Sequence, residues 1–190
     1  MAGLNPFENY VVGISITGAQ LRKWLEHSAL AFNMLTPTKP NQFLANPDIP
    51  AFQFDTIFGQ NYLIDPTQEP YARISAMNYA GAPVLENQQF ILATNQFRAS
   101  GGGGYAPTRK KRIVTTLDTS IEVSMIEVLQ SGTPAPWGDS APWSFAPPVP
   151  TQALIYTHPD AMEQIADIRH LRPTLQGSTP DGFIRISLTL

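Results

Sequence analysis

The sequence predicts an α+β fold. Segments with the alternation of a half-buried strand and segments with helical periodicity are mixed along the chain, and they follow no regular strand–helix–strand period. With 190 residues, 43% of them hydrophobic, the chain can bury the core of one domain, which we expect to span residues 1–190. Proline occurs 18 times and only 14% of residues are charged. These values indicate a compact, loop-rich domain.

The N-terminal part predicts a strand followed directly by a helix. Residues 10–16 alternate in polarity, as in a half-buried strand. Thr17 with Gln20 three residues later forms a capping box, and apolar residues then recur at helical spacing. His27 lies beside this apolar stripe, with no second metal ligand three or four residues away. We therefore expect it to be a surface or hydrogen-bonded histidine.

The middle of the chain predicts mainly sheet. Four prolines in residues 33–50 indicate a connecting loop. Residues 52–65 are rich in aromatic and β-branched side chains, which predicts one or two strands with a turn or bulge at Gly59. Residues 73–79 and 89–94 predict two further strands, joined through residues 81–83.

The second half predicts alternating strands and helices. Residues 113–117 have the composition of a strand, Asp118 or Thr119 can cap a helix, and Gly132 can end it. The periodicity predicts that the inward side of this helix contains Ile121, Met125, Val128 and Leu129. A strand at 153–156, a short helix at 159–168 and a terminal strand at 182–190 follow.

A proline-rich stretch at 131–150 interrupts the second half. It contains six prolines, a composition typical of a linker, but also Trp137, Trp143 and Phe145. Because of these aromatic residues we expect an ordered loop packed on the domain.

Charge and composition exclude several classes of protein. The net charge of −3 gives no general basic field for a nucleic-acid polymer, so we expect no such partner. The basic run 109–112 is interpreted as a solvated entrance to a strand, or alternatively as a contact for phosphate or a partner. There are no cysteines, no apolar window of about 18 residues and no signal peptide at the start of the chain. We expect no membrane association.

The most distinctive segment is residues 94–105, where a strand leads into Phe97, Arg98 and four consecutive glycines. Glycines allow positive φ angles and close approach of a ligand, and an aromatic ring offers a flat surface for stacking. The lysine and Ser/Thr of a P-loop are missing. The histidines are far apart in the sequence, and no nucleophile–base pair, carboxylate pair or metal-ligand cluster is evident. The sequence predicts a binding surface with no catalytic residues, no metal ligands and no cofactor of its own.

Four motifs occur in order along the chain. They are Pro6-Phe7-Glu8-Asn9-Tyr10-Val11-Val12, Ile16-Thr17-Gly18-Ala19-Gln20-Leu21 with Trp24-Leu25-Glu26, Phe54-Asp55-Thr56-Ile57-Phe58-Gly59 with Ile64-Asp65, and Ala93-Thr94-Asn95-Gln96-Phe97-Arg98-Ala99-Ser100-Gly101-Gly102. Together they resemble the C-terminal domain of the 5′-nucleotidase family, and most of all its bacterial 2′,3′-cyclic-nucleotide 2′-phosphodiesterase/3′-nucleotidase branch. The similarity continues through residues 143–147 to the closing strand, and so covers nearly the whole chain.

The resemblance implies an α/β/β/α arrangement of mixed sheets and helices. It also implies that this domain holds nucleosides and 2′,3′-cyclic or 3′-nucleotides, and presents the phosphate to a separate N-terminal metallophosphoesterase domain with two divalent metals. The parent would then be a periplasmic or secreted phosphoric ester hydrolase of nucleotide catabolism. The family domain begins upstream of Pro6, so we expect this chain to be N-terminally truncated and inactive alone.

The resemblance also implies site residues. An aromatic pair sandwiches the base, and one partner is Phe97. The second is Phe7, which the cyclic-phosphodiesterase branch favours, or Phe54, to which the 5′-nucleotidases point.

The loop itself supplies the remaining candidates. Arg98 contacts phosphate or ribose, or pairs with a carboxylate such as Asp55, and Asn95 shapes the loop through the backbone. The glycines expected at the ligand are Gly101, Gly102 and Gly103. Because other relatives have aspartate where this chain has Gly103, the resemblance favours cyclic and 3′-nucleotides over 5′-nucleotides.

Two alternatives remain open at this point. One is the substrate domain of a 5′-nucleotidase or UDP-sugar hydrolase. The other is a non-enzymatic module that binds a protein through its exposed aromatic residues and the proline-rich stretch. The exposure of Trp137 and Trp143 separates the second alternative from a nucleotide-binding domain: one exposed patch would favour partner binding, and burial would favour the nucleotide-binding interpretation.

Overall fold

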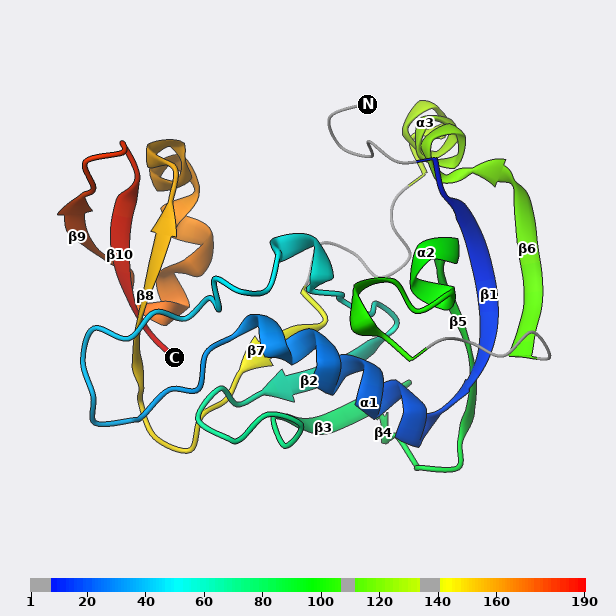
Figure 1. Cartoon of the computed structure of the whole chain (residues 1–190), viewed down its shortest axis with the longest axis horizontal. Helices are drawn as coiled ribbons and strands as arrows, with labels where there is room; N and C mark the ends of the chain where they lie inside the picture. Colours follow the sequence, from blue (N-terminus) through cyan, green and yellow to red (C-terminus); the bar gives the residue numbers. More distant parts are fainter. Residues whose placement is uncertain (1–7, 107–111, 134–140) are drawn as a thin grey trace.

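The computed structural model describes residues 8–106, 112–133 and 141–190, and within them it has an α+β fold. Three small sheets follow one another along the long axis of the molecule, and the first helix lies across the central one (Figure 1). The predicted fold class is confirmed.

The first sheet places the N-terminal strand at its centre. Strand β1 (Tyr10–Thr17) pairs antiparallel with β5 (Gln89–Asn95) on one side and β6 (Ile113–Ser120) on the other. Val12, Ile14 and Ile16 are buried on one face of β1, as the alternation in residues 10–16 predicts. The strand runs directly into α1 (Gly18–Ser28), so this sheet positions the start of the helix.

The capping box predicted at Thr17 is present. The Thr17 hydroxyl accepts from the backbone N–H of Gln20 at 3.2 Å, and the Gln20 side chain accepts from the N–H of Thr17 at 3.0 Å. The helix buries Leu21, Trp24 and Leu25, then tightens into the 3₁₀ turn η1 (Ala29–Ala31). Local chemistry therefore fixes where this helix begins and which side faces the core.

The second sheet has the order β4-β3-β2-β7. Strands β2 (Gln60–Ile64), β3 (Ile74–Tyr79) and β4 (Ala82–Pro83) are antiparallel, and β7 (Trp143–Phe145) joins β2 in parallel. The prediction for residues 52–65 was too extensive, because residues 51–53 form the 3₁₀ turn η2 (Ala51–Gln53) and regular pairing begins only at β2, after Gly59. Gly59 has φ +89°, which a turn entering the strand requires.

The proline-rich stretch is ordered where the structure describes it. Trp143 and Phe145 are half-buried in β7, and they pack on the main core, as expected for an ordered loop. Trp137 lies outside the described residues. The parallel pairing of β7 with β2 was not predicted, since it joins residues about 80 positions apart in the sequence.

The third sheet is C-terminal and has the order β8-β10-β9. The predicted strands correspond to β8 (Gln152–Thr157) and β10 (Ile184–Thr189), while β9 (Thr174–Ser178) was not predicted. The predicted helix at 159–168 is a 3₁₀ helix, η5 (Pro159–Leu171), with non-helical backbone at Ile168. Leu35, Leu44 and Ile186 belong to a second core under this sheet, next to the main core on α1 and β2.

Helix α3 (Ile121–Ser131) differs from its prediction. Ser120, and not Asp118 or Thr119, caps it, because β6 extends to Ser120; Gly132 ends it at φ +63°, as expected. The inward face was wrong: none of the helix's residues is buried, and Val128 and Leu129 are 56% and 69% exposed. A helical stripe identifies an apolar side but not an element that covers it.

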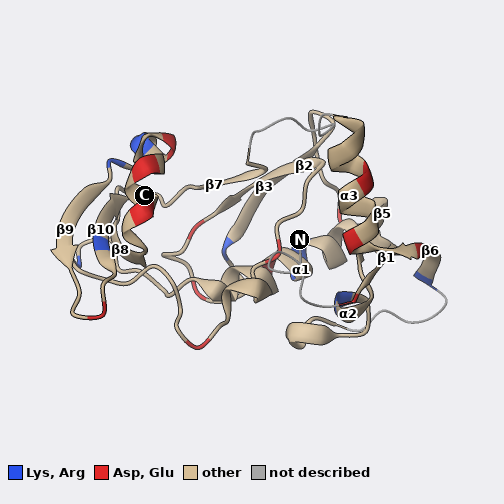
Figure 2. Ribbon diagram, turned by 90° about the horizontal axis from the view of Figure 1, so that it is seen from above, with Lys and Arg blue, Asp and Glu red and all other residues tan. Residues whose placement is uncertain are grey.

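Charges are scattered over the elements. Figure 2 shows Lys and Arg in separate places and no continuous basic face on the described part of the chain. In the same residues, no helix combines the length and the apolar character needed to span a bilayer.

Candidate functional site

The candidate site begins where β5 ends. Asn95 is the N-cap of the short helix α2 (Gln96–Ala99), and its side-chain oxygen accepts from the backbone N–H of Arg98 at 2.7 Å. The role predicted for Asn95, shaping the loop through the backbone, is thus seen in the structure. Phe97 is exposed whereas Arg98 is buried, and the guanidinium carbon of Arg98 lies 5.5 Å from the centroid of the Phe97 ring.

Phe97 lies on α2 with 45% of its surface exposed. Its ring rests against the glycine loop, defined here as Gly101 to Gly104: a Cβ added to Gly102 would lie 2.5 Å from three ring carbons. Gly101, Gly103 and Gly104 have φ angles of +99°, +74° and +80°. Glycine is therefore required both for close contact with the ring and for the left-handed backbone around it.

Arg98 is buried, and its guanidinium binds the glycine loop through a backbone carbonyl. Its Nε donates to both carboxylate oxygens of Asp55, at 2.9 and 3.0 Å, and its Nη1 donates to the carbonyl of Gly102 at 3.2 Å. Its Nη2 donates to the carbonyl of Phe52. Of the two roles predicted for Arg98, the structure has the pairing with Asp55. With 4% exposure the guanidinium has no face free for a ligand.

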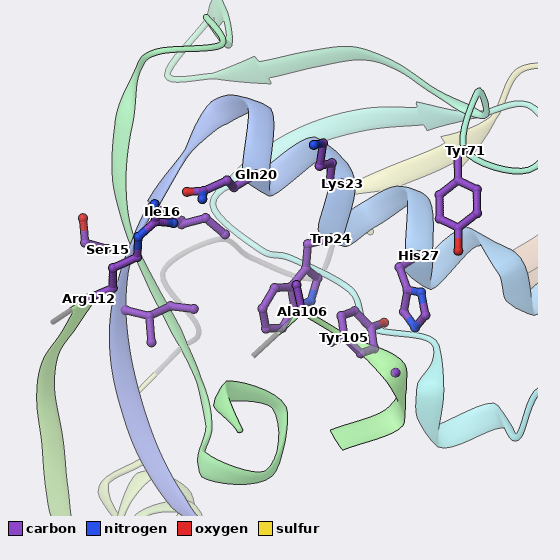
Figure 3. A pocket seen from close by; sticks show the side chains of 12 residues that line it. Ser15, Ile16, Gln20, Lys23, Trp24, His27, Tyr71, Tyr105, Ala106 and Arg112 are labelled. Carbon is purple, nitrogen blue, oxygen red and sulfur yellow. The ribbon is translucent and has the colours of Figure 1, made fainter. Parts of the chain in front are cut away.

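A histidine and a tyrosine support the glycine loop from the side of α1. The Nε2 of His27 lies 2.9 Å from the carbonyl of Gly103 and must donate, because a carbonyl only accepts. The Tyr105 hydroxyl donates to the carbonyl of Gln53 at 2.7 Å, and burial raises the pKa of Tyr105 to about 12. The two rings meet edge to face at 4.5 Å (Figure 3). His27 is thus hydrogen-bonded, as expected.

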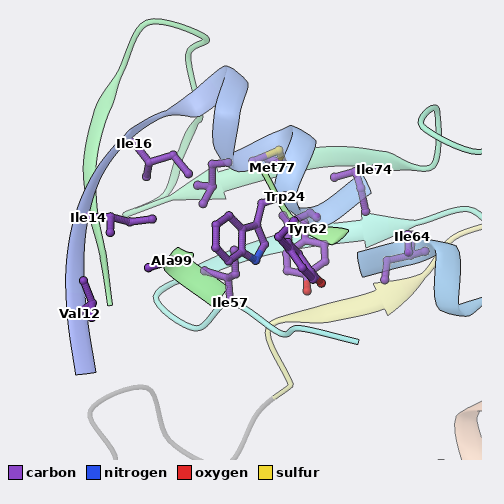
Figure 4. Packing of buried hydrophobic residues seen from close by; sticks show 14 residues of the cluster. Val12, Ile14, Ile16, Trp24, Ile57, Tyr62, Ile64, Ile74, Met77 and Ala99 are labelled. Carbon is purple, nitrogen blue, oxygen red and sulfur yellow. The ribbon is translucent and has the colours of Figure 1, made fainter. Parts of the chain in front are cut away.

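Asp55 connects this support to the hydrophobic core. Its Oδ2 accepts from the indole N–H of Trp24 at 3.0 Å, and its backbone carbonyl accepts from the Ser28 hydroxyl at 2.7 Å. Figure 4 shows the Trp24 indole in the middle of the buried cluster, between strand β1 and the four-stranded sheet. The position of the glycine loop is therefore set by helix α1.

Of the two candidates for the second aromatic partner, only Phe54 lies within the described residues. Phe54 is half-buried, with its ring 5.1 Å from Phe32 and 5.4 Å from Trp143, both in edge-to-face contact. Phe7 lies outside the described residues.

One exposed ring near the site was missed from the sequence. Phe52 is 67% exposed on η2, the turn whose carbonyl accepts from Arg98. The aromatic composition of residues 52–65 suggested a strand that would half-bury it. Pro50 before the turn was the available signal that regular pairing starts later.

The described residues contain no cluster of three or more His, Cys, Asp or Glu side chains that could hold a metal ion. The polar side chains around the loop form hydrogen bonds within the protein, as seen for Arg98, Asp55 and His27. What the arrangement offers is a rigid loop with one exposed ring, suited to binding.

The chain is similar to a known protein family and to curated proteins. Residues 1–110 match the family model for the 5′-nucleotidase C-terminal domain. The trifunctional nucleotide phosphoesterase YfkN of Bacillus subtilis is 32% identical over 155 residues, 74% of this chain and 10% of that protein. The 2′,3′-cyclic-nucleotide 2′-phosphodiesterase/3′-nucleotidase of Haemophilus influenzae is 34% identical over 127 residues, 60% of this chain and 19% of that protein.

Solved structures agree on the fold. A candidate 5′-nucleotidase from Staphylococcus aureus superposes with a TM-score of 0.67 at 22% identity, over 76% of this chain and 28% of that one. The chain thus spans only about a tenth to a fifth of the length of these two curated relatives. The match of residues 1–110, with the order of motifs from residue 6 to the glycine loop, establishes that the chain belongs to the 5′-nucleotidase family and carries its C-terminal domain.

Proposed function

We propose that this chain is the nucleotide-binding part of a 2′,3′-cyclic-nucleotide 2′-phosphodiesterase/3′-nucleotidase. Phe97 stacks on the base, and the bound nucleotide presents its phosphate to a separate N-terminal metallophosphoesterase domain that carries two divalent metals. The parent enzyme is a periplasmic or secreted hydrolase of nucleotide catabolism. Alone, the chain binds and does not hydrolyse.

The observation that carries this proposal is the exposed ring of Phe97 on an immobilised support. Exposure of an apolar ring to water costs free energy, and here the position of the ring is fixed by the Asn95 cap, by Gly102 and by the buried Arg98–Asp55 pair. A ring held in one orientation loses little conformational entropy on stacking. Such a support favours a flat ligand over a flexible one.

The second stacking ring is proposed to be Phe7. The ring of Phe54 is already in edge-to-face contact with two other aromatic rings, so moving it onto a base would open the core. Phe7 is the residue to which the cyclic-phosphodiesterase branch points.

The substrate class is proposed from the resemblance at Gly103, where other relatives have aspartate and the cyclic-phosphodiesterase branch has glycine. The loop of this chain presents backbone there, with the carbonyls of Gly102 and Gly103 bonded to Arg98 and His27. The proposed ligands are therefore nucleosides and 2′,3′-cyclic or 3′-nucleotides. Stacking contributes about 1–3 kcal/mol per base contact, which gives dissociation constants in the millimolar range for the chain alone.

An NMR titration of the chain with 3′-AMP, 2′,3′-cyclic AMP and 5′-AMP tests the proposal. We expect shifts of the Phe97 and Gly101 to Gly104 amides, with 5′-AMP the weakest ligand. Phe97→Ala should abolish these chemical-shift changes. Phe183→Ala removes a ring of matched exposure (44%) next to the C-terminal sheet, and it should leave them unchanged. A titration with no shift at these amides would contradict the proposal.

Two further measurements, of ligand preference and of hydrolysis, distinguish the proposed function from the alternatives. Preference for 5′-AMP or a UDP-sugar would identify a 5′-nucleotidase or UDP-sugar hydrolase in place of the proposed enzyme. Hydrolysis of bis-p-nitrophenyl phosphate by the purified chain with added divalent metal should be undetectable. Turnover abolished by Phe97→Ala would instead place the chemistry in this domain.

A further inference from the structure

A cavity of about 520 Å³ lies next to the glycine loop, between β1, α1 and the turn after Gly104 (Figure 3). Phe97, Arg98 and Asn95 do not line it, so it is separate from the proposed base site. Its volume falls within the range of about 300–1,000 Å³ typical of small-molecule pockets. The two sites share only the glycine loop, since Gly104 lines the cavity.

The inner wall of the cavity is aromatic. Trp24 and Tyr105 line it with ring centroids 4.8 Å apart and ring planes tilted by 43°, and both residues are otherwise buried. Their polar atoms are used elsewhere, in bonds to Asp55 and to the carbonyl of Gln53. The wall therefore presents aromatic carbon in a fixed orientation, which suits a flat ligand.

The rim of the cavity is positively charged. Lys23 comes from α1 and Arg112 from the residue before β6, and no Asp or Glu is among the lining residues. Within the described part of the chain neither cation forms an ion pair or a side-chain hydrogen bond. Figure 3 shows Lys23 and Arg112 at separate places on the rim, with Gln20 and Ile16 drawn between them. The field in the cavity thus favours an anion.

Tyr71 adds an unusual backbone feature at the same rim. It is a non-glycine residue with φ +70°, in the left-handed region that costs L-residues about 1 kcal/mol or more. This conformation places its ring over the cavity, with the hydroxyl toward His27 (Figure 3). Strained residues at the rim of a pocket are typical of binding sites.

We propose that this cavity is a second ligand site, for a small phosphate monoester that carries a flat ring. The ring packs on Trp24 and Tyr105, and the phosphate pairs with Lys23 or Arg112 at the rim. A dianion is favoured because both cations lack a carboxylate partner in the described residues. The proposal does not depend on base stacking at Phe97.

Phenyl phosphate is the probe for this site, with phenol, benzoate and inorganic phosphate as comparisons. NMR titration should shift the Trp24 indole N–H and the amides of residues 14–16, 23–27 and 104–106. Phenyl phosphate should bind more tightly than any of the three, and added salt should weaken it. Lys23→Gln and Arg112→Gln should each weaken it by about fivefold, as expected for one solvent-screened charge contact.

The controls separate this site from the base site. Lys39→Gln removes the same charge from an exposed loop residue that does not line the cavity, and it should not change phenyl phosphate binding. Phe97→Ala removes the proposed stacking ring, and it should leave the phenyl phosphate shifts at Trp24 and at residues 14–16 and 23–27 in place. Lys23→Arg should restore it. The proposal is overturned if phenol or benzoate binds as tightly as phenyl phosphate, if neither charge variant weakens binding, or if the shifts appear at Phe97 instead.

Discussion

Arg98 and Asp55 lie 43 residues apart in the sequence, and their Nε and Oδ1 atoms are 2.9 Å apart in a largely buried ion pair. The pair joins the glycine loop to helix α1, because Asp55 also accepts from Trp24 and Ser28. One side of the proposed nucleotide site is therefore anchored to the hydrophobic core.

Replacing Arg98 should lower the free energy of unfolding of the domain. Arg98→Met leaves the Asp55 carboxylate without its cation, and loss of one partner of a buried pair destabilises a protein by about 3 kcal/mol. Urea unfolding measures the change. Arg169→Met, which removes an exposed arginine from η5, should leave the midpoint nearly unchanged. Equal midpoints for the two variants would show that the buried pair contributes nothing.

The glycine loop contains a position where backbone conformation and contact both exclude a side chain. At Gly103, φ is +74° and an added Cβ would lie 2.5 Å from Arg98 Nη1. Gly132 has φ +63° with nothing within 4 Å of an added Cβ, so it isolates the backbone part. Gly132→Ala should cost about 1 kcal/mol of unfolding free energy, and Gly103→Ala about 1 kcal/mol more. Equal losses in thermal or urea unfolding would mean that Arg98 moves aside freely.

Stability should fall at alkaline pH through Tyr105. Burial raises its pKa from the ordinary tyrosine value of 10.0 to about 12 in the folded state. A raised pKa means that the folded state holds the proton more tightly, so this stabilisation is complete below pH 10 and is lost as the pH rises towards 12. Urea unfolding as a function of pH checks this, with tyrosinate absorbance as a second readout. Tyr105→Phe should be less stable at neutral pH but lose less between these two pH values; parallel curves would contradict the assignment.

A buried glutamine should be replaceable with a gain in stability. Gln60 is 6% exposed, and neither its Oε1 nor its Nε2 has a hydrogen-bond partner in the described residues. It lines a small cavity of about 80 Å³ beside Tyr79 and Phe90. Gln60→Leu removes the unpaired groups and should raise the free energy of unfolding by about 1 kcal/mol. Gln152→Leu, at an exposed position of β8, should change it by less than about 0.5 kcal/mol. A loss at position 60 would indicate that water satisfies the amide.

Local chemistry made part of this fold predictable. The capping box at Thr17 and Gln20 places the start of α1 at the right residue, and the alternation around Ile14 identifies the buried face of β1. Asn95 acts through the backbone of its own loop, three residues away. In each case the partners are close in sequence, so their spacing carries the information.

Long-range pairing was not predictable in the same way. The parallel addition of β7 to β2 depends on a short strand within a proline-rich stretch, and nothing near Trp143 specifies its partner. The apolar side of α3 has the right period yet remains exposed. For Arg98 both a ligand and Asp55 were plausible partners, and only the fold decides between residues so far apart.

Phe32 and Phe145, whose rings meet edge to face at 5.1 Å, pack against both hydrophobic cores. A protein cut after residue 110, where the family model ends, would lose Phe145 together with the strand that covers the edge of β2. Residues 1–110 alone therefore lack part of the packing around the main core. Expression boundaries for this domain should be drawn beyond β10, and shorter pieces should aggregate through the uncovered aromatic cluster around Phe32 and Phe54.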